Sequence, residues 1–211
     1  MCGHRGFDQR QEIYVVFSRS KGRTGKNHAA GKTLQTGGAF CNCRVWLSYR
    51  RNKWRNTDKY KGEVFAPENY SFEYLFATTL AGQPLAWMEG TNLPEEAFTL
   101  REHTEAYKKF QHDMHSGTIL PIGDEPSGRS WTGFQSLKKD RGYLIVYREN
   151  HPEGTTEVDT WLPEGVTVRC IPLMGHGKAM TAVTGKKGRL EISLPSINDY
   201  VVYKYEIKNK R

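Results

Sequence analysis

The sequence predicts an α+β protein in which a helical segment precedes an antiparallel β-sandwich. Apolar residues recur at spacings of three and four in residues 71–81 and 95–115, which is typical of helices that bury one face. From residue 118 onward the pattern changes to short runs of period two, separated by Gly, Pro, Asn or Asp. Residues 1–61 show no sustained pattern and hold the whole basic excess of the chain. We therefore expect a basic leader (1–61), a helical segment (62–117) and a C-terminal β-sandwich (118–211).

The basic leader carries 14 Lys and Arg against 3 Asp and Glu, a net charge of +11 in a chain whose net charge is +8. It has two interpretations. Clustered cations with Trp46, Tyr49 and Trp54 between them suit contacts to phosphates and stacking on bases. Because the sequence contains no known nucleic-acid module, we favour the second interpretation, a solvated, poorly ordered leader or a segment that does not belong to the parent fold.

Two motifs in the leader are too incomplete to define a site. Cys41 and Cys43 form a C-x-C pair, but a structural zinc site normally has two such pairs, and Cys170 is distant. Residues 25–33, GKNHAAGKT, end like a phosphate-binding loop, yet Lys26 stands where its first glycine belongs. The sequence therefore predicts neither a metal nor a cofactor. It also predicts no membrane span, because no apolar run approaches about 18 residues, and its start does not resemble a secretory signal.

The helical segment is predicted to contain a helix, a strand and a second helix. Ser71 is a candidate cap for the first helix. Residues 85–88, LAWM, form a short apolar run typical of a buried strand. The second helix is predicted over residues 95–115, and we expect its Tyr107 and Phe110 to be buried.

The C-terminal segment is predicted to form an antiparallel sandwich of short strands. The predicted strands are 131–137, 143–149, 155–162, 167–173, 189–194 and 200–207. Residues expected to face the interior are Leu144, Val146, Val168, Ile192 and Val202.

Several segments resemble the α-galactosidase-type glycoside hydrolases of clan D. Residues 85–96, LAWMEGTNLPEE, resemble the last strand and the start of the last helix of the catalytic barrel in that clan. Residues 106–119, AYKKFQHDMHSGTI, resemble the end of the same helix. Residues 121–136 resemble the beginning of the C-terminal sandwich in bacterial members related to family 36. The resemblance covers residues 57–211.

The resemblance implies a fold and a chemistry of which this chain holds only the final part. Such enzymes carry an Asp nucleophile and an Asp acid/base on a (β/α)₈ barrel of about 250 residues and hydrolyse α-linked sugars with retention. Those aspartates belong to earlier strands, so the catalytic residues are unknown here, and we expect the chain to be inert alone. Residues 62–117 would be a barrel remnant, whose uncovered apolar surface on helix 71–81 and strand 85–88 would favour self-association.

Two residues are candidates for contacts to a carbohydrate. Glu89 would lie at the C-terminal end of the last barrel strand, where such enzymes bind substrate. Trp131, at the start of the sandwich, offers a ring on which a sugar can stack. Each has a structural alternative, because Glu89 also suits an ordinary loop and Trp131 also suits the core.

Other polar pairs favour structural roles. Asp124 and Glu125 are adjacent, so their side chains diverge in an extended chain, and a turn suits them better than acid/base catalysis. His112 and His115 lie at i and i+3 with an aspartate between them. Metal binding is one interpretation of the histidines, but stabilisation of the helix C-terminus is favoured over it.

Three functional hypotheses follow. The favoured one is a C-terminal portion of a retaining, α-galactosidase-like glycoside hydrolase, with a carbohydrate as partner. The second is a carbohydrate-binding or scaffolding sandwich without catalysis. The third is a nucleic-acid-binding protein that acts through residues 1–61. The sequence leaves the localisation unknown, although the family that it resembles is often secreted or periplasmic.

Overall fold

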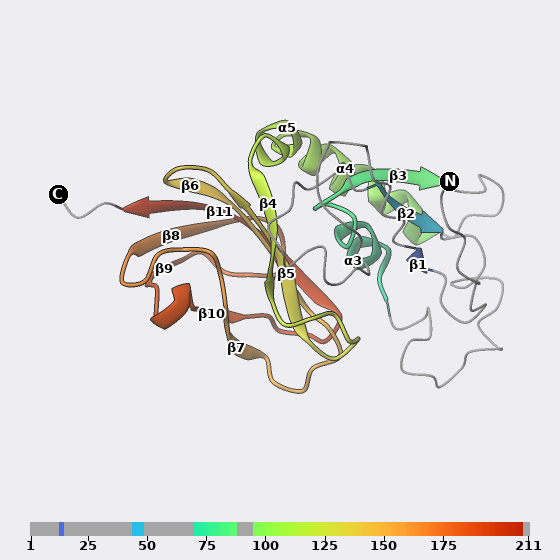
Figure 1. The fold of residues 1–211 in the computed structure, drawn as a ribbon. Helices are drawn as coiled ribbons and strands as arrows, with labels where there is room; N and C mark the ends of the chain where they lie inside the picture. Colours follow the sequence, from blue (N-terminus) through green and yellow to red (C-terminus); the bar gives the residue numbers. More distant parts are fainter. Residues whose placement is uncertain (1–12, 15–43, 49–69, 88–94, 209–211) are drawn as a thin grey trace, which may run out of the picture.

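A computed structural model describes residues 13–14, 44–48, 70–87 and 95–208 of the chain (Figure 1). Most of the basic leader, with its cysteine pair and its glycine-rich stretch, lies outside the described residues. Glu89 lies outside them too. In the described part of the chain, no helix is long and apolar enough to cross a membrane.

A small three-stranded sheet joins two described pieces of the leader to the helical segment (Figure 1). Strand β2 (Arg44–Ser48) lies between β1 (Ile13–Tyr14) and β3 (Gln83–Trp87). It pairs antiparallel with β1 and parallel with β3. The strand predicted at 85–88 is therefore present with shifted ends, and β2 is a strand within the leader, where the sequence showed no sustained pattern. A five-residue strand leaves too short a pattern to detect, and pairing with β3 defines it.

Among the described residues, three α-helices and a 3₁₀ turn lie between the leader and the main sheet. A second 3₁₀ turn, η3 (Lys186–Gly188), lies between β9 (Met180–Val183) and β10 (Leu190–Ser193). Helix α3 (Phe72–Ala77) begins at the predicted cap, because Ser71 Oγ accepts a hydrogen bond of 3.0 Å from the N–H of Tyr74. The predicted helix 95–115 is divided into the 3₁₀ turn η2 (Glu95–Thr99), α4 (Leu100–Lys108) and α5 (Gln111–His115). The break falls at Phe110, whose φ of −127° and ψ of −5° are not helical.

Six strands form the main sheet in the order β4-β5-β6-β11-β8-β9, and all neighbours in it are antiparallel. Two further strands, β7 and β10, form a separate antiparallel pair. The strands are β4 (Thr118–Gly123), β5 (Trp131–Leu137), β6 (Arg141–Arg148), β7 (Thr155–Val158), β8 (Thr167–Gly175), β9 (Met180–Val183), β10 (Leu190–Ser193) and β11 (Asp199–Lys208). All six predicted strands are present. Strand β5 has the predicted bounds, and the other five have shifted ends.

The sequence did not predict the two edge strands, β4 and β9. Strand β4 contains Pro121, which the edge of a sheet tolerates because the missing N–H faces away from the ladder. Strand β9 has four residues whose side chains are all at least partly exposed, so its sequence has no buried alternation to detect.

The described structure has three layers, with the main sheet in the middle (Figure 1). One core fills the space between the main sheet and the β7–β10 pair, and a second fills the space between the main sheet and the helices. The predicted α+β class with a C-terminal sandwich is therefore confirmed, whereas the described residues do not show a barrel.

The second core changes two expectations. All five residues predicted to be interior are buried, but Val202 packs in the core that faces the helices, not in the one between the sheets. Tyr107 and Phe110 are buried in the same core, as predicted. The expectation that the first helix exposes apolar surface was wrong for α3, because Phe72 and Leu80 are fully buried.

Candidate functional site

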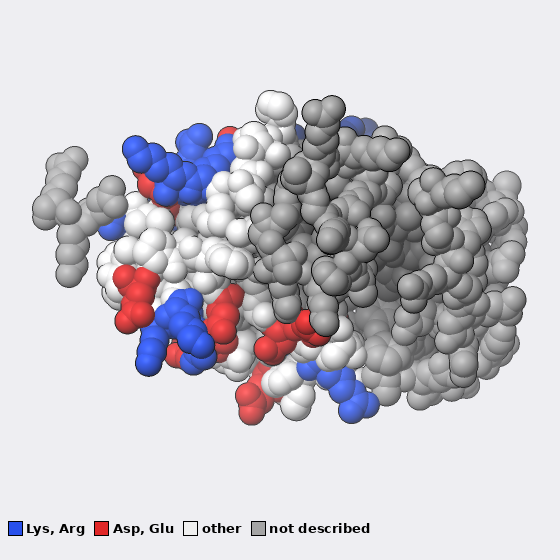
Figure 2. All heavy atoms as spheres, in the orientation of Figure 1, with Lys and Arg blue, Asp and Glu red and all other residues white. Residues whose placement is uncertain are grey.

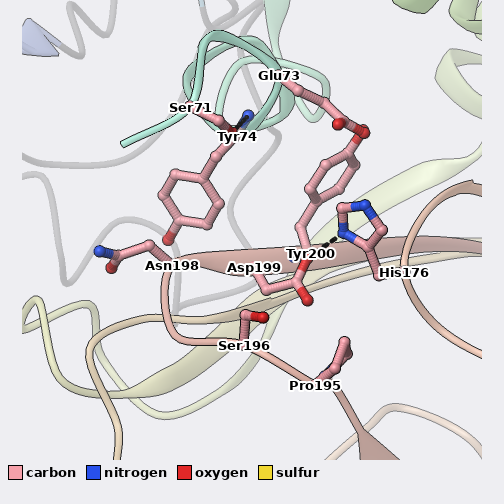
Figure 3. Close-up of a pocket in the computed structure, with 9 residues that line it drawn as sticks. All are labelled: Ser71, Glu73, Tyr74, His176, Pro195, Ser196, Asn198, Asp199 and Tyr200. Atoms are coloured by element: carbon pink, nitrogen blue, oxygen red, sulfur yellow. Dashed lines mark hydrogen bonds and ion pairs between the residues drawn. The ribbon is translucent and has the colours of Figure 1, made fainter. Parts of the chain in front are cut away.

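A polar cleft of about 260 Å³ lies where the start of α3 meets the sandwich. Three segments that are distant in the sequence form it: the start of α3, the turn after β8, and the loop that leads into β11 (Figure 3). Several of its side chains carry hydrogen-bonding groups. The lining residues are Ser71, Glu73, Tyr74, His176, Pro195, Ser196, Asn198, Asp199 and Tyr200.

A histidine–aspartate pair lies in this cleft (Figure 3). His176 Nδ1 lies 2.7 Å from Oδ1 of Asp199, which also accepts a 2.7 Å hydrogen bond from the N–H of Tyr200. The hydrogen bond that His176 donates to Asp199 raises the pKa of His176. The negative charges of Asp199 and Glu73 also raise this pKa, whereas partial burial lowers it. The imidazole therefore favours its protonated form more than a free histidine does.

The backbone around His176 explains how the pair is positioned. Gly175 ends β8 with a φ of +77°, which turns the chain back toward β11. The N–H of His176 then donates a hydrogen bond of 3.0 Å to the carbonyl oxygen of Tyr200. The side chain of Asp199 is almost fully buried, and its Oδ2 has no hydrogen-bond partner among the described residues.

A second polar contact connects α3 to β11. The hydroxyl of Tyr200 donates a hydrogen bond of 2.7 Å to Oε1 of Glu73, and His103 Nδ1 lies 3.6 Å from the same oxygen. Burial, followed by the bond to the Glu73 carboxylate, raises the pKa of Tyr200 far above its ordinary value. The phenol therefore keeps its proton at neutral pH and joins the helix to the sheet.

The arrangement does not form a pair of catalytic carboxylates. Retaining hydrolysis needs two carboxyl groups about 5–5.5 Å apart on either side of one sugar bond. In the cleft, Glu73 accepts the Tyr200 hydroxyl, while Asp199 is buried behind His176. The cleft is suited to hold α3 against the sandwich, and its exposed imidazole can bind a hydroxyl group or an anion.

Two residues of the predicted His112–His115 motif, Asp113 and His115, contact neighbouring side chains near the end of α5. Asp113 contacts Lys138 and accepts a hydrogen bond of 2.7 Å from the hydroxyl of Tyr143. These hydrogen bonds lower the pKa of Asp113. His115 Nε2 lies 2.7 Å from the hydroxyl of Tyr107, and burial lowers its pKa. Within the described ranges, no three His, Cys, Asp or Glu side chains are placed to hold a metal ion.

Of the two predicted carbohydrate contacts, Trp131 lies outside the cleft, and Glu89 lies outside the described residues. Trp131 is only 3% exposed and packs in the core between the two sheets, which is the structural alternative for this residue. Asp124 and Glu125 occupy the exposed turn after β4. Their backbones define it, since Asp124 N–H donates to the carbonyl oxygen of Trp131 and Glu125 C=O accepts from the Ser130 hydroxyl.

Ser71 was predicted as a helix cap, but the sequence did not predict that it and the other lining residues form a cleft. Glu73 and Tyr200 are separated by 127 positions, so no local motif could join them. The available signal was the acidic residue that directly precedes the apolar run of β11, because a carboxylate at the end of a buried strand needs a partner.

The fold of the chain was compared with known proteins by sequence and by structure. No protein-family model and no curated protein matches the sequence. The structure is similar to an α-amylase from Geobacillus thermoleovorans that was crystallised with acarbose, with 13% sequence identity and a TM-score of 0.51 over 84% of this chain and 43% of that one. The fold of this chain is therefore similar to that of part of an α-amylase.

A second α-amylase, from Anoxybacillus and described as part of a new glycosyl hydrolase subclass, matches with 14% identity and a TM-score of 0.49. That match covers 80% of this chain and 39% of the other. The chain thus spans about two-fifths of the length of either structure. At such low identity the likeness concerns the fold alone.

Proposed function

We propose that the chain is the C-terminal portion of a retaining glycoside hydrolase that acts on α-linked sugars. The observation that carries the proposal is the fold similarity over 84% of the chain, a share too large to be supplied by the sandwich alone. In this proposal, residues 118–208 are the accessory sandwich and residues 70–117 are the last strand and helices of a barrel.

Two further observations support the barrel assignment. The parallel pairing of β2 with β3 is the arrangement of neighbouring strands in a (β/α)₈ barrel, whereas the antiparallel pairing of β2 with β1 is not. The clan D resemblance independently assigns β3 and the helices after it to the end of such a barrel. That resemblance favours an α-galactosidase, whereas the solved structures are α-amylases, so we propose α-linked glycosides as the substrate class with galactosides as the first candidate.

Several described carboxylates already bind other side chains, which supports the proposal that the isolated chain does not catalyse hydrolysis. Glu73 binds Tyr200 and Asp199 binds His176 where α3 meets β11, Asp113 contacts Lys138, and Asp159 pairs with Arg189. A pair of carboxylates that are free, facing one another and shielded from water is not found among the described residues. The sandwich and its helical layer therefore suit a supporting role beside a catalytic domain.

Hydrolysis assays with the purified chain test this proposal. We expect no release of nitrophenol from nitrophenyl α-galactoside or nitrophenyl α-glucoside above the rate in buffer. Glu89→Gln, Asp124→Asn and Glu125→Gln variants serve as controls for an unrecognised site. Turnover by the wild-type chain that disappears in one of these variants would contradict the proposal.

The coding sequence upstream of residue 1 provides a second test. The proposal predicts a stretch there that encodes alternating strands and helices, with Asp residues at the ends of strands. An upstream region without such a pattern would leave the sandwich as an independent module and favour the carbohydrate-binding alternative.

A further inference from the structure

The exposed Trp161 is the most unusual apolar side chain on the described surface. It lies in the loop between β7 and β8, and 52% of the residue is exposed. Tryptophan normally buries most of its large ring, so an exposed indole needs a reason. The large apolar residues that the described surface exposes are Phe98, Trp161, Leu173, Val183 and Ile197.

Hydrogen bonds hold Trp161 in a fixed position. Its backbone N–H donates 2.8 Å to Oε1 of the fully buried Gln135, and its indole Nε1 donates 2.8 Å to the carbonyl oxygen of Pro121 in β4. On either side, Asp159 C=O accepts from the N–H of Gly123, and Leu162 is buried in the core between the sheets. The ring is thus fixed before any ligand arrives, which lowers the entropic cost of binding.

Two acidic residues precede Trp161 by two and four positions in the chain, and both contact Arg189. Arg189 Nε lies 2.6 Å from Oδ1 of Asp159, two residues before Trp161, and Arg189 NH1 lies 3.6 Å from Oε2 of Glu157. All three side chains are substantially exposed, so they keep donors and acceptors that face solvent. The described part of the face in Figure 2 likewise shows acidic and basic side chains lying side by side.

We propose that Trp161 is the platform of a surface glycan-binding site. The C–H face of a pyranose ring would stack on the exposed indole, while sugar hydroxyls would bind Asp159 and Arg189. Because the indole N–H already binds Pro121, the ring contributes its face and not its polar edge. A single ring among charged side chains is too small an apolar patch for a stable protein partner, which favours a sugar. The α-linked class of glycan rests on the proposed function.

Native electrophoresis in gels that contain a polysaccharide tests the site. We expect soluble starch, or galactomannan through its α-linked galactosyl branches, to slow the full chain relative to a gel without polysaccharide. Trp161→Ala should weaken this binding about tenfold or more, because removal of a ring-stacking contact typically has that effect. Trp161→Phe should keep part of it, since a phenyl ring still offers a face.

Phe98→Ala is the matched control. Phe98 is 68% exposed but belongs to the helical layer, on the other side of the main sheet from the β7–β8 loop. Its loss should leave retardation unchanged. Circular dichroism spectra of all variants should match that of the wild-type chain.

Three results would overturn the proposal. The first is no retardation of the wild-type chain in either polysaccharide, and the second is retardation of Trp161→Ala equal to that of the wild-type chain. The third is a loss of retardation in Phe98→Ala as large as the loss in Trp161→Ala. Stronger retardation by the β-linked polymer hydroxyethylcellulose would overturn the assignment to α-linked glycans. None of these results depends on hydrolysis or on the upstream coding sequence, so failure here and failure of the proposed function are distinguishable.

Discussion

At the scale of single residues, the His176–Asp199 pair is the most distinctive polar feature of the described structure. Its two members come from the turn after β8 and the start of β11, and both lie in the cleft beside α3. The pair makes the stability of the folded chain depend on pH. The raised pKa of His176 means that the folded chain binds a proton more tightly than the unfolded chain.

The sign of this effect determines a pH prediction. A raised histidine pKa stabilises the folded state fully below the unfolded value of 6.5, and the stabilisation is lost as pH rises through the folded pKa. We expect His176→Gln to lower the free energy of unfolding more at pH 5 than at pH 8.5. Urea denaturation of both proteins at several pH values measures the difference.

The comparison between wild type and His176→Gln is necessary because His115 acts in the opposite direction. Burial lowers the pKa of His115, so its contribution to stability is complete above the unfolded pKa of 6.5 and is lost as pH falls below that value through the folded pKa. Both proteins contain His115, and its effect cancels in the difference. A difference in the free energy of unfolding between wild type and His176→Gln that grows with increasing pH would show that the folded state does not favour the protonated imidazole of His176.

At the scale of elements, β8 and β11 meet with an irregular register. The pairing shifts between Val202 and Tyr203, and Gly175 ends β8 directly beyond this shift. A Cβ atom at Gly175 would press against the carbonyl oxygen of Tyr200, and the φ of +77° disfavours any L side chain. The close approach of two backbones therefore explains the glycine, and it positions His176.

Gly165 allows the two effects to be separated. It has a similar φ of +73°, but an added Cβ would meet no atom within 4 Å. Gly165→Ala should cost about 1–2 kcal/mol from the backbone conformation alone. Gly175→Ala should cost about 2–5 kcal/mol, because the steric clash adds to the same strain. Equal losses in urea denaturation would mean that the Tyr200 backbone moves aside without cost.

At the scale of the whole molecule, the three layers share one central sheet. Strands β6 and β11 bury side chains on both faces, so the helices and the β7–β10 pair both pack on the same strands. Phe110 connects the layers, since its ring stacks on Tyr143 of β6 at a centroid distance of 5.7 Å and meets Tyr107 edge-on at 5.6 Å. Loss of this contact should therefore affect the molecule as a unit.

Phe110→Ala is expected to lower the free energy of unfolding by about 3–5 kcal/mol, the usual cost of removing a buried phenyl ring. Far-ultraviolet and near-ultraviolet circular dichroism should report the same lowered midpoint, because helices and sheet share one core. The exposed Phe98→Ala should change stability by no more than about 0.5 kcal/mol. Separate midpoints for the two signals would show that the helical layer unfolds independently.

The sequence by itself determined the local elements. Period-two runs and turn residues located six strands, and Ser71 marked the start of α3, because alternation and capping depend only on neighbouring residues. Only the tertiary structure decided which face each side chain meets. The run from Tyr200 to Tyr205 is buried on both faces, so its sequence could not assign Val202 to the helical side. The tertiary structure also joined Glu73 to Tyr200 and left Trp161 exposed while Trp131 became buried, since such contacts depend on how distant strands and helices pack.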